Sequence, residues 1–137
     1  MLTTPGQREL GERAVRALGP LAAGLCSEAV MHVPRQAADA GRRQAQDLAA
    51  DCCVAIGGGS TIGLGKAIAL TTSLPILAVP TTYAGSEMTP IYGITEDGLK
   101  TTGRDPRVLP RTVLYDPALT LDLPPALSAA SGMNAVA

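Results

Sequence analysis

Aromatic side chains are almost absent from this sequence. Its 137 residues include no tryptophan, no phenylalanine and only three tyrosines. Proteins that bind single-stranded nucleic acid use aromatic side chains as stacking platforms, so this class of function is disfavoured. The core must instead be built from aliphatic side chains, and an apolar content of 46% predicts a folded domain.

The sequence also lacks an excess of charge of either sign. It has 11 basic and 12 acidic residues, and no long run of one sign is present. A polyanionic partner such as nucleic acid is therefore not expected. No apolar run approaches the length of a membrane helix, and the first residues do not resemble a secretory signal. We expect a cytoplasmic protein with neither nucleic acid nor a membrane as partner.

Residues that bind metals or form disulfides are few. Cys26, Cys52 and Cys53 are odd in number and two are adjacent, so a disulfide framework is not expected. His32 is the only histidine, and no other residue stands at metal-ligand spacing from it. We interpret His32 as a loop or strand-end histidine, away from the loops that carry the function, and we predict no metal site.

The most informative stretch is residues 51–66. The apolar residues 51–56 predict a strand, three glycines follow, and Ser60 or Thr61 is expected to begin a helix. Such a turn presents the free N–H groups of a helix start to an anion, most often a phosphate or pyrophosphate. The spacing matches neither the dinucleotide fingerprint nor the Walker loop. A tight turn without a ligand is the alternative, less favoured because one glycine would suffice.

Strand and helix patterns alternate along the chain. Strands are predicted at residues 2–4, 25–33, 51–56, 76–79 and 112–115, a hairpin at 91–94 and 99–102, and an extended segment at 119–123. Helices are predicted at residues 5–18, 34–48 and 61–70, with a short helix from Pro124 and a new helix from Met133. This order predicts an α/β fold with a doubly wound, mostly parallel, Rossmann-like sheet. Ligands bind at the carboxyl ends of such strands, so the hydroxyl-rich loop at 80–89 is expected to line a cofactor.

Several short motifs follow one another along the chain. They are Gly57-Gly58-Gly59-Ser60, Pro80-Thr81-Thr82 with Gly85-Ser86-Glu87, and Asp116-Pro117 with Leu119-Thr120. Together they resemble the iron-containing alcohol dehydrogenase family, which has a dehydroquinate synthase-like fold. Residues 81–90, with Lys100-Thr101-Thr102, Arg104-Asp105-Pro106 and Val108-Leu109-Pro110, are similar to the maleylacetate reductases of that family. The resemblance covers nearly the whole chain.

The resemblance implies a dinucleotide-binding domain at residues 1–130 and the start of a truncated helical domain at 131–137. NAD or NADP is the implied cofactor, with its pyrophosphate on Gly58, Gly59 and Ser60. The other implied cofactor-binding residues are Thr81, Thr82, Tyr83 and Ser86 near the nicotinamide, Lys100 toward the cleft, and Leu119 near the adenosine. The implied activity is NAD(P)H-dependent reduction of the carbon–carbon double bond of maleylacetate to 3-oxoadipate, in the degradation of aromatic compounds, by a full-length homodimer.

The resemblance also implies what this chain does not contain. The family's catalytic histidines belong to the helical domain, so no catalytic residue is expected here and the chain alone is expected to be inactive. Relatives that bind a metal have an Asp where Asn134 stands, and many relatives have an acid near Thr4 that binds the adenosine ribose. Because Thr4 stands in place of that acid, we expect weaker discrimination against the 2′-phosphate of NADP. Two alternatives stay open: another alcohol or glycerol dehydrogenase or a dehydroquinate synthase, and a nucleotide-binding or assembly module without chemistry.

Overall fold

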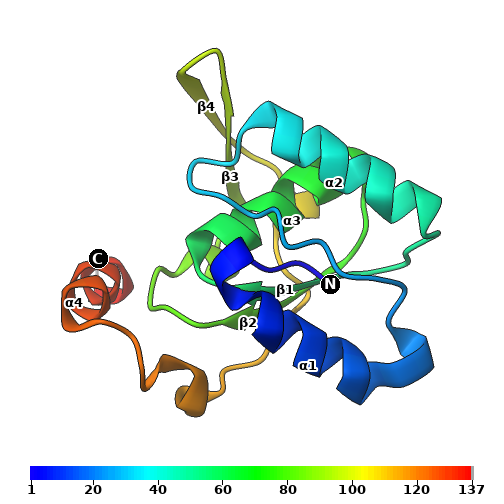
Figure 1. Ribbon diagram of the computed structural model, residues 1–137. Helices are drawn as coiled ribbons and strands as arrows, with labels where there is room; N and C mark the ends of the chain where they lie inside the picture. Colours follow the sequence, from blue (N-terminus) through cyan, green and yellow to red (C-terminus); the bar gives the residue numbers. More distant parts are fainter. Residues whose placement is uncertain (137) are drawn as a thin grey trace.

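The computed structural model describes residues 1–136 and is drawn in Figure 1. The α-helices are α1 (Arg8–Leu18), α2 (Arg35–Asp47), α3 (Gly59–Thr72) and α4 (Pro125–Val136). The strands are β1 (Cys53–Gly57), β2 (Ile76–Pro80), β3 (Ile91–Glu96), β4 (Leu99–Arg104) and β5 (Thr112–Val113). Short 3-10 helices are η1 (Pro5–Gln7), η2 (Gly19–Leu21), η3 (Ser86–Met88), η4 (Pro106–Val108) and η5 (Pro117–Thr120). No helix within these residues is long and apolar enough to cross a membrane.

A parallel sheet with the strand order β1-β2-β5 forms the centre of the fold. β1 pairs with β2 along its whole length. On the other side of β1, Leu2 bridges in parallel to both Ala55 and Cys26. The strands predicted at residues 2–4 and 25–33 are thus reduced to these bridges. The predicted fold is confirmed: an α/β chain with a doubly wound, mostly parallel sheet.

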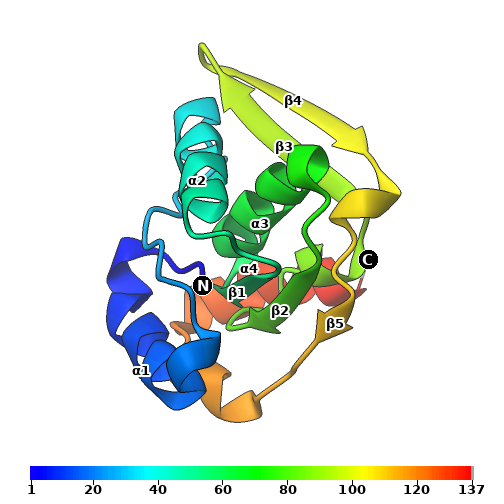
Figure 2. The same cartoon turned by 90° about the vertical axis from the view of Figure 1, so that its right-hand side faces the viewer.

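Helices cover both faces of this sheet (Figures 1 and 2). Successive side chains of an extended segment point to opposite faces. The Cδ1 atom of Leu2 lies 3.5 Å from the position that a Cβ of Gly65 in α3 would take. The Cγ2 atom of Thr3 lies 2.8 Å from the corresponding position of Gly11 in α1. α3 and α1 therefore lie on opposite sides of the parallel strands.

α3 is the central helix of the core. It is apolar nearly all round, and it lies between the sheet and α2. Gly41 of α2 lets the two helices approach closely, because a Cβ there would lie 2.9 Å from the Cδ1 atom of Ile68. The largest fully buried apolar side chains are Ile62, Leu64, Ile68, Ile76 and Val108. The core is aliphatic, as the composition required.

The predicted hairpin is present as β3 and β4, which pair in antiparallel register. Asp97 and Gly98 form its turn, with φ angles of 48° and 77°. Positive φ at both central residues is the geometry of a type I′ turn, which suits the twist of paired strands and favours Asp-Gly. In Figure 1 the hairpin projects from the body of the molecule at the top.

The strand predicted at residues 25–33 is wrong beyond Cys26. The chain turns at Met31 and His32, and the next two residues lead into α2. His32 and Val33 have φ angles of 66° and 45°, which a strand does not allow. Each such residue costs on the order of 1–3 kcal/mol of strain. The bend therefore depends on other contacts, and the backbone of Thr95 supplies one by donating to the Val33 carbonyl at 3.0 Å.

The last part of the chain differs from prediction in three places. β5 ends at Val113 instead of residue 115, although the Leu114 N–H still donates to the Ala78 carbonyl at 2.9 Å. Residues 119–123 are not extended, because the Asp116 carboxylate caps η5 by accepting from the N–H of Ala118 at 3.0 Å. One helix, α4, replaces the two that were expected near residues 124 and 133. The division of the chain at residue 130 stays a prediction, and residue 137 lies outside the described residues.

Candidate functional site

The turn between β1 and α3 can be made only with glycine at its first position. Gly57 has a φ angle of 153°. A Cβ at this residue would lie 2.3 Å from the Oγ1 atom of Thr61 and 2.9 Å from the Oε1 atom of Gln7. The strand predicted at residues 51–56 therefore continues to Gly57 and ends where the backbone bends sharply.

α3 begins two residues earlier than predicted, at Gly59, and Gly58 is its N-cap residue. The carbonyl of Gly58 accepts from the N–H groups of Thr61 and Ile62, both at 3.1 Å. Within residues 1–136, the N–H groups of Gly59 and Ser60 have no backbone acceptor, and no side chain caps the helix. Free N–H groups at a helix start carry partial positive charge, which is the chemistry of a phosphate site.

A groove of about 1060 Å³ lies at this end of the sheet. This volume is at the upper end of the roughly 300–1,000 Å³ common for ligand pockets. Eight of the nine residues predicted to bind the cofactor line the groove, and they are Gly58, Gly59, Ser60, Thr81, Thr82, Ser86, Lys100 and Leu119. The ninth, Tyr83, is not among its lining residues. The fold thus brings the predicted residues together, while their role in binding stays a prediction.

The loop after β2 packs directly on the glycine turn. The N–H of Thr81 donates to the carbonyl of Gly57 at 3.1 Å, and its Oγ1 accepts from the Nε2 atom of Gln7 at 2.9 Å. The Cγ2 atom of Thr82 lies 2.9 Å from the position that a Cβ of Gly58 would take. The two loops that the sequence singled out therefore form one continuous wall.

α4 forms another wall of the groove and is tied to the loop by Ser131. This serine is 5% exposed. Its hydroxyl donates to the Leu127 carbonyl at 2.7 Å and accepts from the backbone N–H of Tyr83 at 3.3 Å. The bond to Leu127 gives the buried hydroxyl a partner within the helix. The ring of Tyr83 is 40% exposed, so it is the backbone of this residue that the structure fixes.

Lys100 on β4 reaches the groove across β3. Its Cε atom lies 2.8 Å from the position that a Cβ of Gly93 would take. A side chain at residue 93 would therefore push Lys100 aside. Gly93 and Lys100 both line the groove, so the hairpin contributes an exposed positive charge to it.

Comparison with known proteins shows the family of the chain. A model of the family described as iron-containing alcohol dehydrogenase matches residues 1–117. The chain belongs to the iron-containing alcohol dehydrogenase family. A maleylacetate reductase of Burkholderia cepacia is 61% identical over the whole chain. The crystal structure of a maleylacetate reductase from Agrobacterium tumefaciens is 53% identical, with a TM-score of 0.95 over 97% of this chain and 38% of that one.

A more distant structural neighbour was solved with a cofactor. The sulfoacetaldehyde reductase of Bifidobacterium kashiwanohense in complex with NAD⁺ is 27% identical, with a TM-score of 0.89. The match covers 98% of this chain and 42% of that structure. The chain spans 39% of the length of the Burkholderia cepacia enzyme.

Metal binding by the family, implied by its name, finds no counterpart in the described residues. They contain no cluster of three or more His, Cys, Asp or Glu side chains that could hold a metal ion. Asn134, at the position where metal-binding relatives were expected to have an Asp, lines the groove with an amide instead of a carboxylate. The residues present do not make an iron site, and no chemical step is derived through a metal.

Sequence reasoning did not single out Lys66, although it lines the groove. It is the only charged residue of α3 and is 1% exposed. Its Nζ atom donates to the carbonyls of Thr89 and Ile91, both at 2.7 Å. Burial lowers the pKa of Lys66 to about 8, opposed by the nearby Glu87. A lone lysine in an otherwise apolar helix was the available signal, and the structure shows that this lysine fastens the start of β3 to α3.

His32 was expected away from the functional loops, and this is wrong. It lines the same groove as the glycine turn and the loop after β2. The bend at residues 31–33 turns the segment out of the sheet and over α3, where the Cγ2 atom of Val33 lies 2.8 Å from the position of a Cβ of Gly63. No local pattern predicted this bend, because a positive φ is a genuine outlier for a β-branched residue such as Val33.

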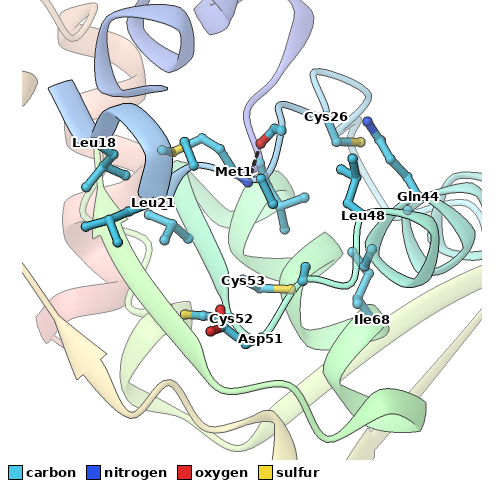
Figure 3. A pocket seen from close by; sticks show the side chains of 18 residues that line it. Met1, Leu18, Leu21, Cys26, Gln44, Leu48, Asp51, Cys52, Cys53 and Ile68 are labelled. Atoms are coloured by element: carbon cyan, nitrogen blue, oxygen red, sulfur yellow. Dashed lines mark hydrogen bonds between the residues drawn. The ribbon is translucent and has the colours of Figure 1, made fainter. Parts of the chain in front are cut away.

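A second cavity, of about 100 Å³, lies near the start of β1 and is shown in Figure 3. All three cysteines line it, and the amino group of Met1 donates to the Gly24 carbonyl at 2.9 Å beside it. Burial raises the pKa of the Cys52 thiol, and it raises that of Cys53 to about 11. Thiols that stay protonated are poor nucleophiles. This cavity has neither the size nor the reactive groups of the groove.

Proposed function

We propose that the groove binds NADH or NADPH, and that the chain is the cofactor-binding part of a maleylacetate reductase. The observation that carries the proposal is the pair of free N–H groups at Gly59 and Ser60, which open into a groove of about 1060 Å³. A pyrophosphate placed there accepts hydrogen bonds from both groups and meets the positive end of α3. Gly58 leaves the backbone bare at the closest point of approach.

The loop after β2 supports the nicotinamide end of the same cofactor. Thr81, Thr82 and Ser86 add hydroxyl groups to the groove wall. The bond from Gln7 to Thr81 and the contact of Thr82 with Gly58 hold this wall rigid. When bound, the reduced nicotinamide supplies a hydride. The two-electron reduction of a carbon–carbon double bond then needs one further proton, so maleylacetate, the hydride and the proton together give 3-oxoadipate.

Similarity supports maleylacetate as the substrate. The Burkholderia cepacia and Agrobacterium tumefaciens relatives are maleylacetate reductases, at 61% and 53% identity. The exposed ammonium of Lys100 suits a small substrate that carries carboxylates. The NAD⁺ complex of sulfoacetaldehyde reductase supports a nicotinamide dinucleotide as the cofactor.

The experiment is a substrate panel on the full-length protein. NADH and NADPH consumption is followed with maleylacetate, with short-chain aldehydes and with dihydroxyacetone as the oxidised substrate. We expect maleylacetate to be reduced with the highest kcat/KM. Preferred reduction of an aldehyde or of dihydroxyacetone would instead assign the protein to the alcohol or glycerol dehydrogenases of the same family.

A further inference from the structure

His32 occupies a turn position with a positive φ, which is uncommon for residues other than glycine. The N–H of Val33 donates to the carbonyl of Val30 at 3.3 Å, and His32 is the third residue of this turn, with a φ of 66°. Positive φ at the third residue of a turn is normally met by glycine or asparagine. His32 is exposed, so its ring is not needed to fill the core. A strained, exposed side chain that lines a groove points to a role in the groove.

Thr95 of β3 holds this strained segment with two hydrogen bonds. Its Oγ1 atom donates to the carbonyl of His32 at 2.8 Å, and its N–H donates to the carbonyl of Val33 at 3.0 Å. Both carbonyls of the two positive-φ residues are thus bound by a single residue. The same Thr95 pairs with Lys100 across the hairpin. One position of β3 therefore holds the backbone of His32 and pairs with Lys100, and both of these residues line the groove.

The bend puts His32 close to the start of α3. Val33 packs on Gly63, with 2.8 Å between its Cγ2 atom and the position of a Cβ on that glycine. Gly63 is four residues after Gly59, which is about one turn of helix. His32 directly precedes the residue that makes this contact, and it lines the same groove as Gly59 and Ser60.

The charges around His32 favour an anionic ligand. Arg35 and Glu96, on the elements that flank the bend, form an ion pair with each other at 2.7 Å, so they neutralise one another. Among the described residues that line the groove, Asp122 is the only acid and Lys100 is an exposed base, whereas Lys66 is buried with its Nζ atom bound to two backbone carbonyls. An imidazole in these surroundings is suited to donate a hydrogen bond to an anionic oxygen.

We propose that His32 is a cofactor-binding residue, that its imidazole contacts an anionic group of the nicotinamide dinucleotide, and that Thr95 positions it. The proposal rests on the dinucleotide groove proposed above and adds to it a residue from outside the loops at the strand ends. It commits to the cofactor and not to the small acid substrate, because His32 lies beside the start of α3.

The test uses the fact that His32 is the only histidine of the chain. Its ring proton signals in an NMR spectrum of the 137-residue chain therefore need no further assignment. NADH is titrated in one series and maleate, as a dicarboxylate probe, in another, and calorimetry on the same samples reports whether NADH binds. We expect the His32 ring signals to move with NADH and to saturate with the calorimetric Kd.

Three variants separate the role of the ring from the shape of the turn. His32→Asn removes the imidazole, and asparagine tolerates positive φ, so we expect the melting temperature to be retained and NADH binding to weaken about three- to tenfold, as for one lost hydrogen bond. Thr95→Val removes the hydroxyl that binds the His32 carbonyl but keeps the branched shape. It should weaken NADH binding and reduce the shift of the ring signals, and Thr95→Ser should restore both.

Four outcomes of these experiments would contradict one or both proposals. NADH binding without any movement of the His32 signals overturns this inference and leaves the proposed function standing. Movement with maleate but not with NADH also overturns the assignment to the cofactor. No NADH binding at all overturns both proposals. Equal NADH affinity of the wild type and His32→Asn would show that the imidazole ring does not contribute to NADH binding, and it would overturn this inference.

Discussion

The side chain of Thr82 lies directly over Gly58, with its Cγ2 atom 2.9 Å from the position that a Cβ of residue 58 would take. This contact joins the ends of β1 and β2, two neighbouring parallel strands, at their carboxyl edge. It leaves no room for a side chain at residue 58, and it places the hydroxyl-rich loop against the free N–H groups of α3. The candidate site therefore depends on Gly58, where the loop after β1 meets the loop after β2.

Gly57→Ala should destabilise the fold strongly. The new Cβ would lie 2.3 Å from the Oγ1 atom of Thr61, at a φ angle of 153°. Steric overlap and backbone strain together should lower the free energy of unfolding by about 3 kcal/mol or more. Urea denaturation measures this change. Gly132→Ala is the control, because nothing lies within 4 Å of its Cβ position. Equal losses in the two variants would contradict the account of the turn.

Stability should rise with pH in the range where Lys66 titrates. Burial lowers the pKa of Lys66 in the folded chain to about 8 from the ordinary 10.5. Between these values the unfolded chain holds this proton and the folded chain has lost most of it, so the unfolded state binds more protons. The free energy of unfolding then increases with pH, by up to about 3 kcal/mol from this group alone.

The comparison with Lys66→Met isolates this contribution. Cys53 acts in the opposite direction, because burial raises its thiol pKa to about 11. Above about pH 9 the unfolded chain loses this proton while the folded chain keeps it, so this group lowers the free energy of unfolding as pH rises. That opposing contribution is shared by the wild type and the variant. Urea denaturation between pH 7.5 and 9.5, a range of about two units chosen around the Lys66 pKa, should give a more positive slope for the wild type. Parallel slopes would show that Lys66 keeps its proton throughout.

Ser131→Ala should loosen the loop after β2. The variant removes the acceptor of the Tyr83 N–H, which lies 3.3 Å from the Ser131 hydroxyl. A lost hydrogen bond of this kind costs about 1 kcal/mol. Amide hydrogen exchange at Tyr83 should become several-fold faster, while exchange at β1 stays the same. If Tyr83 exchanges at the wild-type rate, α4 does not support this wall of the groove.

The sequence was sufficient to predict the parallel strands β1 and β2, the glycine turn and most of the groove. Periodicity identified the strands β1 and β2, and the rule that ligands meet the carboxyl ends of parallel strands connected Gly58 with Thr82. The Asp97-Gly98 turn was equally plain, because both residues tolerate positive φ. The family is shown by the comparison, while the cytoplasmic location, the homodimer and the individual cofactor contacts stay predictions.

Other parts of the structure could not be read from local patterns. The bend at His32 depends on Thr95, which is 63 residues away along the chain. Lys66 is buried because the carbonyls of Thr89 and Ile91 accept its hydrogen bonds, and hydrophobic periodicity cannot anticipate such partners. The division of residues 124–136 into two helices failed because Ser131 and Gly132, which suggested a break, lie inside the single helix α4.

Calorimetric titration of NADH into the 137-residue chain tests the central claim most directly. It is run on the wild type, on Gly58→Val and on Gly6→Ala, whose Cβ position has nothing within 4 Å. A valine at residue 58 overlaps Thr82 and covers the N–H groups of the helix start, so the account predicts at least about tenfold weaker binding for this variant. Gly6→Ala should bind like the wild type. Equal affinity of all three proteins, or no binding by the wild type, would contradict a dinucleotide site at the glycine turn.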